Sequence, residues 1–132
     1  RSSAAIRSDR GGGTVSVDGG TYTSSGLGSP AIYSTADITV KNAKLVSEIS
    51  EGAIIEGKNS ITLDNVELIS TNTENVKSSV YKNIFIYQSM SGDADEGEAT
   101  FTCKNSTITT NNGESIYVTN TKALINLEEM LL

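Results

Sequence analysis

The stretch ITLDNVEL, Ile61 to Leu68, recurs in outline at four other places in the chain. Each copy has apolar residues at its first, third and eighth positions and mostly polar residues between them. The other copies are VSVDGGTY from Val15, ITVKNAKL from Ile38, FTCKNSTI from Phe101 and INLEEMLL from Ile125. Their starting positions are separated by 23, 23, 40 and 24 residues, which indicates a repeating structural unit.

The spacing of the apolar positions favours strands over helices. The first and third positions share one face of an extended strand, and Thr, Val and Ile are abundant around them. The fifth position is Gly19, Asn42, Asn65, Asn105 or Glu129. Because Gly and Asn tolerate a positive φ, we expect a sharp corner there, with asparagine amides hydrogen-bonding from copy to copy. A second apolar element follows at Ala31–Ile32, Ala53–Ile54, Ile84–Phe85–Ile86 and Ile116–Tyr117–Val118.

This pattern predicts an all-β fold, a parallel β-helix with about 22–24 residues per coil. The leucine-rich repeat frame is missing, and a β-sandwich is the remaining alternative. The step of 40 residues contains about 17 extra residues, so we expect a loop inserted at about residues 71–98, with Ile84 to Tyr87 continuing a strand inside it. Residues 1–132 are interpreted as a single domain, a piece of a longer chain.

Composition excludes several classes of function. Ten Lys and Arg against sixteen Asp and Glu give a net charge of −6, without the concentrated basic face that nucleic acid requires. Histidine, the usual general base near neutral pH, is absent. The single cysteine, Cys103, stands at an inward position of its copy and is expected to be a buried, inert thiol. The sequence contains no apolar run long enough for a membrane span.

The expected insertion contains the acidic stretch SGDADEGE, Ser91 to Glu98. Alternating carboxylates around glycine resemble the oxygen donors that calcium binds. Asp93 and Asp95, with Glu96 and Glu98, are therefore the candidate calcium ligands. The alternative interpretation is a solvated acidic loop.

Tyrosines outside the inward positions are candidates for sugar binding, because pyranose rings stack on aromatic rings. Tyr33, Tyr81 and Tyr87 are the candidate platform, with Gln88 as a polar neighbour, and Tyr117 is a further candidate. Tyr22 occupies an inward position and is expected in the core. Ordinary turn chemistry is the alternative explanation for these residues.

An enzyme acting on polysaccharides is a further alternative, because glycoside hydrolysis needs two opposed carboxyl groups. The acids Asp64 and Glu67 instead face Lys41 and Lys44 of the preceding copy, which predicts a cross-strand charge ladder. The last copy ends at Leu132 without a polar cap, so we expect either a continuing chain or self-association through that end.

Several runs carry a resemblance to a known family. They are AAIRSDRGGGTVSVDGGTYTSSGLGSPAIYSTADITV from Ala4, EGAIIEGKNSITL from Glu51, IYQSMSGDADEGEATF from Ile86 and YVTNT from Tyr117. The chain resembles large, secreted or surface-attached, adhesin-like proteins of gut anaerobic bacteria. More distantly it is similar to pectate-lyase-like β-helices, including non-catalytic clostridial proteins that bind acidic polysaccharide with calcium. The resemblance implies a right-handed parallel β-helix located outside the cytoplasm, and it carries over no catalytic residues.

We therefore expect a non-catalytic, extracellular or cell-surface module that binds carbohydrate, with calcium as the candidate cofactor. The alternatives are a structural spacer shaft of a larger surface protein and a fragment of a polysaccharide lyase or glycoside hydrolase. An outward row of aromatic residues would favour binding, and a groove of converging acids would favour catalysis.

Overall fold

The computed structural model describes residues 3–8, 12–72, 82–89, 92 and 94–131. Within these residues the chain forms eleven strands and no helix. The strands are β1 (Ile6–Arg7), β2 (Thr14–Asp18), β3 (Thr21–Ser24), β4 (Ile32–Ser34), β5 (Asp37–Ser47), β6 (Ala53–Glu56), β7 (Ser60–Ser70), β8 (Lys82–Tyr87), β9 (Thr100–Thr110), β10 (Glu114–Val118) and β11 (Leu124–Leu131).

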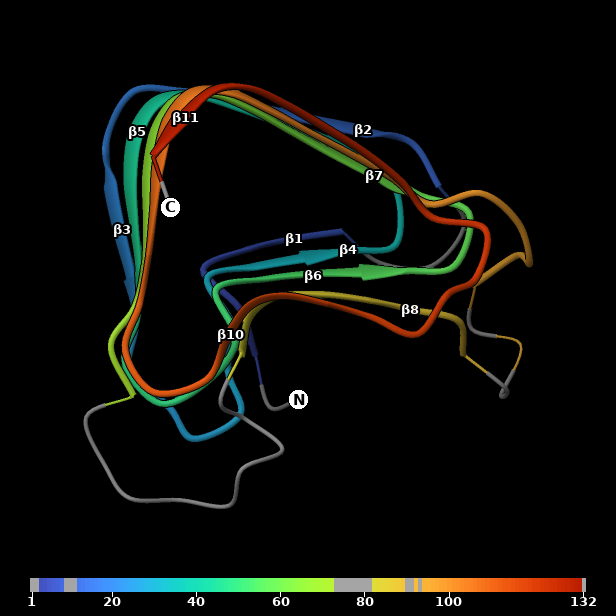
Figure 1. The fold of residues 1–132 in the computed structure, drawn as a ribbon, viewed down its shortest axis with the longest axis horizontal. Helices are drawn as coiled ribbons and strands as arrows, with labels where there is room; N and C mark the ends of the chain where they lie inside the picture. The colour runs from blue at the N-terminus through green and yellow to red at the C-terminus, as the bar shows by residue number, and fades with distance from the viewer. Residues whose placement is uncertain (1–2, 9–11, 73–81, 90–91, 93, 132) are drawn as a thin grey trace.

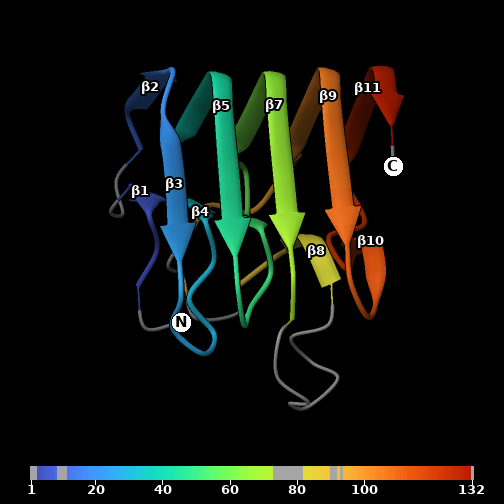
Figure 2. The same cartoon turned by 90° about the vertical axis from the view of Figure 1, so that its left-hand side faces the viewer.

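The strands form two parallel sheets that face each other across the core (Figure 1). The smaller sheet has the order β1-β4-β6-β8-β10. The larger sheet has the order β11-β9-β7-β5-β2, and β3 also pairs with β5. From β4 onward the chain alternates between the sheets, so that β5, β7 and β9 lie side by side in sequence order (Figure 2).

The strand register confirms the sequence repeat. Ile61 of β7 lies opposite Ile38 of β5 and Phe101 of β9, and Phe101 lies opposite Ile125. The third and eighth positions of the copies align in the same way, from Val17 to Leu127 and from Tyr22 to Ile108. Leu132, the eighth position of the last copy, lies outside the described residues. Stacking one repeat on the next thus places like residues in continuous apolar rows.

The predicted corner is confirmed at the fifth position of the copies. The φ angles are 54° at Asn42, 55° at Asn65, 52° at Asn105 and 52° at Glu129, and Gly19 has a φ of 90°. The Asn65 amide donates a hydrogen bond to Asn42 Oδ1 at 2.8 Å, as predicted, whereas the amides of Asn42 and Asn105 donate to Asp18 and Asp64 of the neighbouring strands. These left-handed residues bend β5, β7 and β9 but do not end them.

The prediction of a right-handed parallel β-helix is wrong. The described residues form two separate parallel sheets and no closed solenoid. The physical reason lies at the asparagine corner, which the sequence suggested as a boundary between short strands. At Asn42, Asn65 and Asn105 a single left-handed residue bends the chain without interrupting the ladder, so three of the five copies each contribute one long bent strand of 11 residues to the larger sheet.

The core lies between the two sheets and consists mainly of aliphatic side chains. Ile38, Leu63, Leu68 and Phe101 of the larger sheet are fully buried. From the smaller sheet Ile32, Ala53, Ile55, Ile84 and Ile86 join the same cluster. Tyr22 is half-buried against this core, as expected, and its hydroxyl donates to the Gly19 carbonyl at 2.8 Å.

A column of serines at the ends of the long strands was not predicted. Ser24, Ser47 and Ser70 lie opposite one another and are buried. The Ser24 hydroxyl donates to the Ser29 carbonyl, and the Ser70 hydroxyl donates to the Ser50 carbonyl, both at 2.8 Å. The Ser47 hydroxyl also lies within hydrogen-bond distance of both carbonyls, at 3.4 and 3.2 Å, so the column satisfies buried turn carbonyls where the chain leaves the larger sheet.

The predicted insertion, residues 71–98, contains β8, which pairs with β6 and β10 in the smaller sheet. Ile84 to Tyr87 therefore continue a strand, as the sequence indicated. At the other end of the chain, β11 exposes Leu124, Leu127 and Leu131. Self-association through this end stays a prediction.

Candidate ligand-binding face

The outward side of the smaller sheet carries an aromatic row. Ile32, Ile84 and Ile86 point into the core, so the alternating residues of the same strands point outward. In register these outward residues are Arg7, Tyr33, Ile54, Phe85 and Tyr117, from β1 to β10. Tyr87 lies two residues beyond Phe85 on β8, opposite Glu56 at the end of β6. We call Tyr33, Ile54, Phe85, Tyr87 and Tyr117 the aromatic face.

Two tyrosines of this face and a carboxylate are joined through the Tyr33 hydroxyl. The Tyr33 hydroxyl donates a hydrogen bond to Glu56 Oε2 at 2.5 Å, and the hydroxyl oxygens of Tyr33 and Tyr87 are 2.8 Å apart. Because the Tyr33 proton is directed to Glu56, Tyr87 is the donor in the second bond. The three groups come from β4, β6 and β8, so they tie three neighbouring strands together on the outside of the sheet.

The environment keeps Tyr33 in its neutral form. Burial raises the pKa of Tyr33 far above its ordinary value, and its hydrogen bonds with Glu56 and Tyr87 raise it further. A phenol held in this way donates a hydrogen bond at every physiological pH and is unsuited to act as a base. Tyr33 therefore serves to orient neighbouring groups.

A second set of contacts surrounds Phe85. The rings of Phe85 and Tyr87 are stacked, with centroids 4.9 Å apart and planes 7° from parallel. The Tyr117 ring lies 5.8 Å from Phe85 and is tilted by 51°. The Lys82 ammonium group lies 4.6 Å from the Phe85 centroid and 5.5 Å from the Tyr117 centroid, within the range of a cation–π interaction.

Lys82 is also paired with a buried acid. Its Nζ lies 3.6 Å from Glu51 Oε2, and the Glu51 side chain is fully buried. Glu51 Oε1 accepts a hydrogen bond from the Ser50 hydroxyl at 2.8 Å. A buried charge pair is tolerated only where its atoms have hydrogen-bond or ion-pair partners. These contacts hold Lys82 in place beside the rings of Phe85 and Tyr117.

The aromatic face is ordered and only partly open to solvent. Ile54 points outward yet is 0% exposed, and Tyr33 and Phe85 are its neighbours in register on either side. Tyr117 is the most open ring of the face, with 43% of its surface exposed. A surface of this kind offers a rigid apolar wall together with fixed hydroxyl and carboxylate groups.

The structure brings together two of the predicted sugar-binding residues, Tyr33 and Tyr87. Gln88 follows Tyr87, and its amide donates to the carbonyls of Ser89 at 3.3 Å and Ala94 at 3.4 Å. The Gln88 Oε1 atom is buried without a hydrogen-bond partner. Tyr81 lies outside the described residues.

The acidic loop packs against the turn after β6. Asp95, Glu96 and Glu98 are exposed, and Asp93 lies outside the described residues. The Asp95 carbonyl accepts the Lys58 N–H at 2.8 Å, and the Gly97 carbonyl accepts the Asn120 amide at 3.1 Å. In the described part of the chain no three side chains of a metal-binding type come together. The calcium site stays a prediction, which calorimetric titration of calcium tests, with the Asp93→Asn, Asp95→Asn double variant as control.

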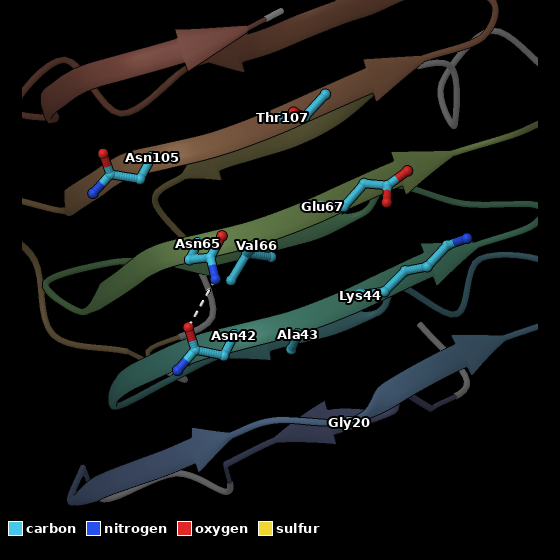
Figure 3. Close-up of a pocket in the computed structure, with 9 residues that line it drawn as sticks. All are labelled: Gly20, Asn42, Ala43, Lys44, Asn65, Val66, Glu67, Asn105 and Thr107. Carbon is cyan, nitrogen blue, oxygen red and sulfur yellow. Dashed lines mark hydrogen bonds between the residues drawn. The ribbon is translucent and has the colours of Figure 1, made fainter.

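A polar groove of about 440 Å³ lies on the bend of the larger sheet, away from the predicted site residues (Figure 3). Asn42, Asn65 and Asn105 form one side, Lys44, Glu67 and Thr107 form the other, and Gly20, Ala43 and Val66 lie between them. We call this feature the asparagine groove. Its lining includes one acid, Glu67, so it does not provide the opposed carboxyl pair of a glycoside hydrolase.

The predicted charge ladder is confirmed in register. Asp64 lies opposite Lys41 and Lys104, and Glu67 lies opposite Lys44. Asp64 also forms an ion pair with Lys104, with Nζ and Oδ2 4.0 Å apart. Because these groups are partly or fully exposed, the pairing contributes at most a few tenths of a kcal/mol.

Cys103 is buried, as expected, in the apolar row of the larger sheet. Burial raises the pKa of its thiol to about 11, against a smaller lowering by the hydrogen bond with Ser106. The thiol therefore remains protonated and is a poor nucleophile near neutral pH.

Sequence reasoning missed the polar half of the aromatic face. Glu56, Glu51 and Lys82 were not among the predicted site residues, yet all three are buried. The available signal was Glu56 itself, because it follows the buried run Ala53 to Ile55 within the same strand. A charge that continues a buried strand must have a partner, and for Glu56 this is the Tyr33 hydroxyl.

Comparison with protein-family models, with curated protein sequences and with solved structures finds no significant match to this chain. None of the described segments forms a helix with the length and apolarity needed to cross a bilayer. The site itself therefore carries the functional argument.

Proposed function

We propose that this chain is a non-catalytic carbohydrate-binding module that acts outside the cytoplasm, and that the aromatic face is its binding surface. The observation that supports this most strongly is the combination of aromatic rings with a fixed hydrogen-bonding group, the Tyr33–Glu56–Tyr87 cluster. Sugars present both apolar C–H faces and hydroxyl groups, so a surface that recognises them needs both elements.

The geometry suits a rigid binding surface. Phe85 and Tyr87 hold each other in a stack, and Lys82 lies against Phe85 and Tyr117. Because these side chains are already ordered, a ligand would lose little additional side-chain entropy on binding. Tyr117, at the β10 edge of the sheet, is the ring most available for stacking against a sugar.

The charge distribution favours a neutral polysaccharide over an acidic one. The aromatic face and its surroundings contain Arg7 and Lys82 against Glu51 and Glu56, and the chain as a whole has a net charge of −6. A polyuronate would be repelled by this field unless calcium bridged the two, as the resemblance to clostridial polysaccharide-binding proteins suggests.

Affinity electrophoresis through gels containing polysaccharide tests this function. The probes are a neutral β-glucan, a neutral xylan and polygalacturonate, each with and without calcium. We expect retardation by a neutral polymer, and Tyr117→Ala should weaken the affinity by about fivefold, since one aromatic contact contributes about 1 kcal/mol.

The matched control is Thr107→Ala, which removes a side chain of the asparagine groove on the other sheet. This variant should bind as the unmodified protein does. Free migration through all three polymers, with and without calcium, would overturn the proposal and leave the structural spacer as the best account.

A further inference from the structure

The turn between β9 and β10 contains the dipeptide Asn112-Gly113. Asn111, Asn112, Gly113 and Glu114 are all exposed. Asn112 has a φ of 60° and Gly113 a φ of 121°, so both residues adopt conformations that ordinary side chains avoid. This turn joins the larger sheet to the strand that carries Tyr117.

We propose that Asn112 is a site of spontaneous deamidation in the folded protein. The Gly113 backbone nitrogen attacks the Asn112 side-chain carbonyl carbon, a new C–N bond forms, and the amide nitrogen leaves as ammonia with the proton from Gly113. Water then opens the resulting succinimide to aspartate or isoaspartate. Because Gly113 has no side chain, nothing hinders the approach of its nitrogen.

The protein contains an internal comparison for this reaction. Asp18-Gly19 can form the same succinimide by loss of water, and Asp18 is also exposed. However, Asp18 lies within β2, and the Gly19 N–H donates to the Lys41 carbonyl at 2.8 Å. For Gly113, the described residues show no backbone hydrogen bond from its N–H. The attacking nitrogen is therefore restrained at Gly19 and available at Gly113.

The other turn asparagines are less favourable. Asn42, Asn65 and Asn105 lie inside long strands, and they precede Ala43, Val66 and Ser106 rather than glycine. Asn111 precedes Asn112, whose side chain hinders the following nitrogen. Among these sites, Asn112 alone combines exposure, a following glycine and a free attacking nitrogen.

The modification would act on a specific contact. The Asn72 amide donates to the carbonyls of Asn111 at 2.7 Å and Asn112 at 3.1 Å, which anchors the turn to the end of β7. Isoaspartate places its Cβ methylene in the main chain between residues 112 and 113 and turns the Asn112 backbone carbonyl into a pendant carboxylate. We therefore expect the Asn72 anchor to weaken and β10 to become more open to hydrogen exchange.

The experiment is incubation of the purified chain at mildly alkaline pH and body temperature, followed by peptide mapping and enzymatic methylation of isoaspartate. We expect isoaspartate at residue 112 in large excess over residues 18 and 111. Asn112→Gln should abolish that signal, and Gly113→Ala should reduce it, because a side chain at residue 113 hinders the attacking nitrogen. Exchange should increase in β10 of the aged protein and remain unchanged in β7.

Two results would overturn the proposal. One is an intact Asn112 in the folded protein under conditions in which the urea-unfolded chain deamidates there, because the fold would then protect the site. The other is equal modification at residues 18 and 112, because the hydrogen bond of Gly19 would then make no difference.

Discussion

The corner row of the larger sheet and the outward row of the smaller sheet are both built by stacking one repeat on the next, yet they differ in content. The corner row is Gly19, Asn42, Asn65, Asn105 and Glu129, and every member has a positive φ. The outward row is Arg7, Tyr33, Ile54, Phe85 and Tyr117, which combines a cation, an aliphatic side chain and three aromatic rings. Positions that repeat meet a need of the backbone, whereas positions that vary on an ordered surface are available for recognition.

The two rows also differ in what their side chains contact. Asn65, Asn42 and Asn105 each donate their side-chain amide to an oxygen of the neighbouring strand, so these bonds hold the bent strands together at the corner. On the smaller sheet the Tyr33 hydroxyl reaches past the neighbouring strand to the Tyr87 hydroxyl and also bonds Glu56. The first arrangement could be extended by adding repeats, while the second is a single local cluster.

The largest effect is expected from breaking the repeated core. Leu63→Ala removes a fully buried side chain from the apolar row of the larger sheet and should cost about 2–5 kcal/mol of unfolding free energy. Urea unfolding measures this change, with Tyr117→Ala as the control on the aromatic face. If Leu63→Ala lowers the unfolding free energy no more than Tyr117→Ala does, the core of the larger sheet contributes no more to stability than the aromatic face.

A smaller loss is expected at the corner. Asn65→Ala places a residue with a Cβ and no amide at a φ of 55° and removes the bond to Asn42, which should cost about 1–2 kcal/mol. Asn65→Gly keeps the backbone freedom and should cost less. If the glycine variant unfolds at lower urea than the alanine variant, the corner does not depend on φ.

The aromatic face should show a pH dependence that the corner lacks. The folded pKa of Tyr33 is raised, while an unfolded tyrosine titrates near pH 10, so this contribution to stability is complete below about pH 10 and declines as the pH rises further. Tyr33→Phe should therefore flatten the loss of unfolding free energy above that pH. Parallel slopes for the two proteins would contradict the role assigned to Tyr33.

The smallest expected effect is an increase in the unfolding free energy. Glu129 holds a φ of 52° without the tolerance of asparagine, so Glu129→Asn should stabilise the protein by roughly 0.5–1 kcal/mol. Glu128→Asn, one residue earlier and outside the left-handed region, is the matched control and should change little. An equal gain in both variants would point to relief of negative charge instead of backbone strain.

Much of the fold could be predicted from the sequence because equivalent positions of the repeat have the same structural role, either an apolar side chain in the core or a positive φ at the corner. The apolar rows and the left-handed corners followed from spacing and residue type alone. The closed β-helix did not follow, because the sequence does not show whether a corner residue separates two strands or bends one. Asn42 and Asn65 bend theirs.

The candidate site was harder to predict because its members come from parts of the chain that do not repeat. Tyr33 and Tyr87 were recognised by residue type, but their meeting point at Glu56 depends on which strands are adjacent. Strand order and register supply that information, and a pattern of single residues does not.

The central claim is that ligand recognition belongs to the aromatic face, and mapping of NMR chemical-shift changes with a short neutral oligosaccharide tests it most directly. Our account predicts changes confined to Tyr33, Phe85, Tyr87, Tyr117 and their neighbours on the smaller sheet. Changes centred on Asn42, Lys44 and Asn65 of the asparagine groove would contradict it, and a spectrum unaltered by neutral and acidic oligosaccharides alike would contradict carbohydrate binding altogether.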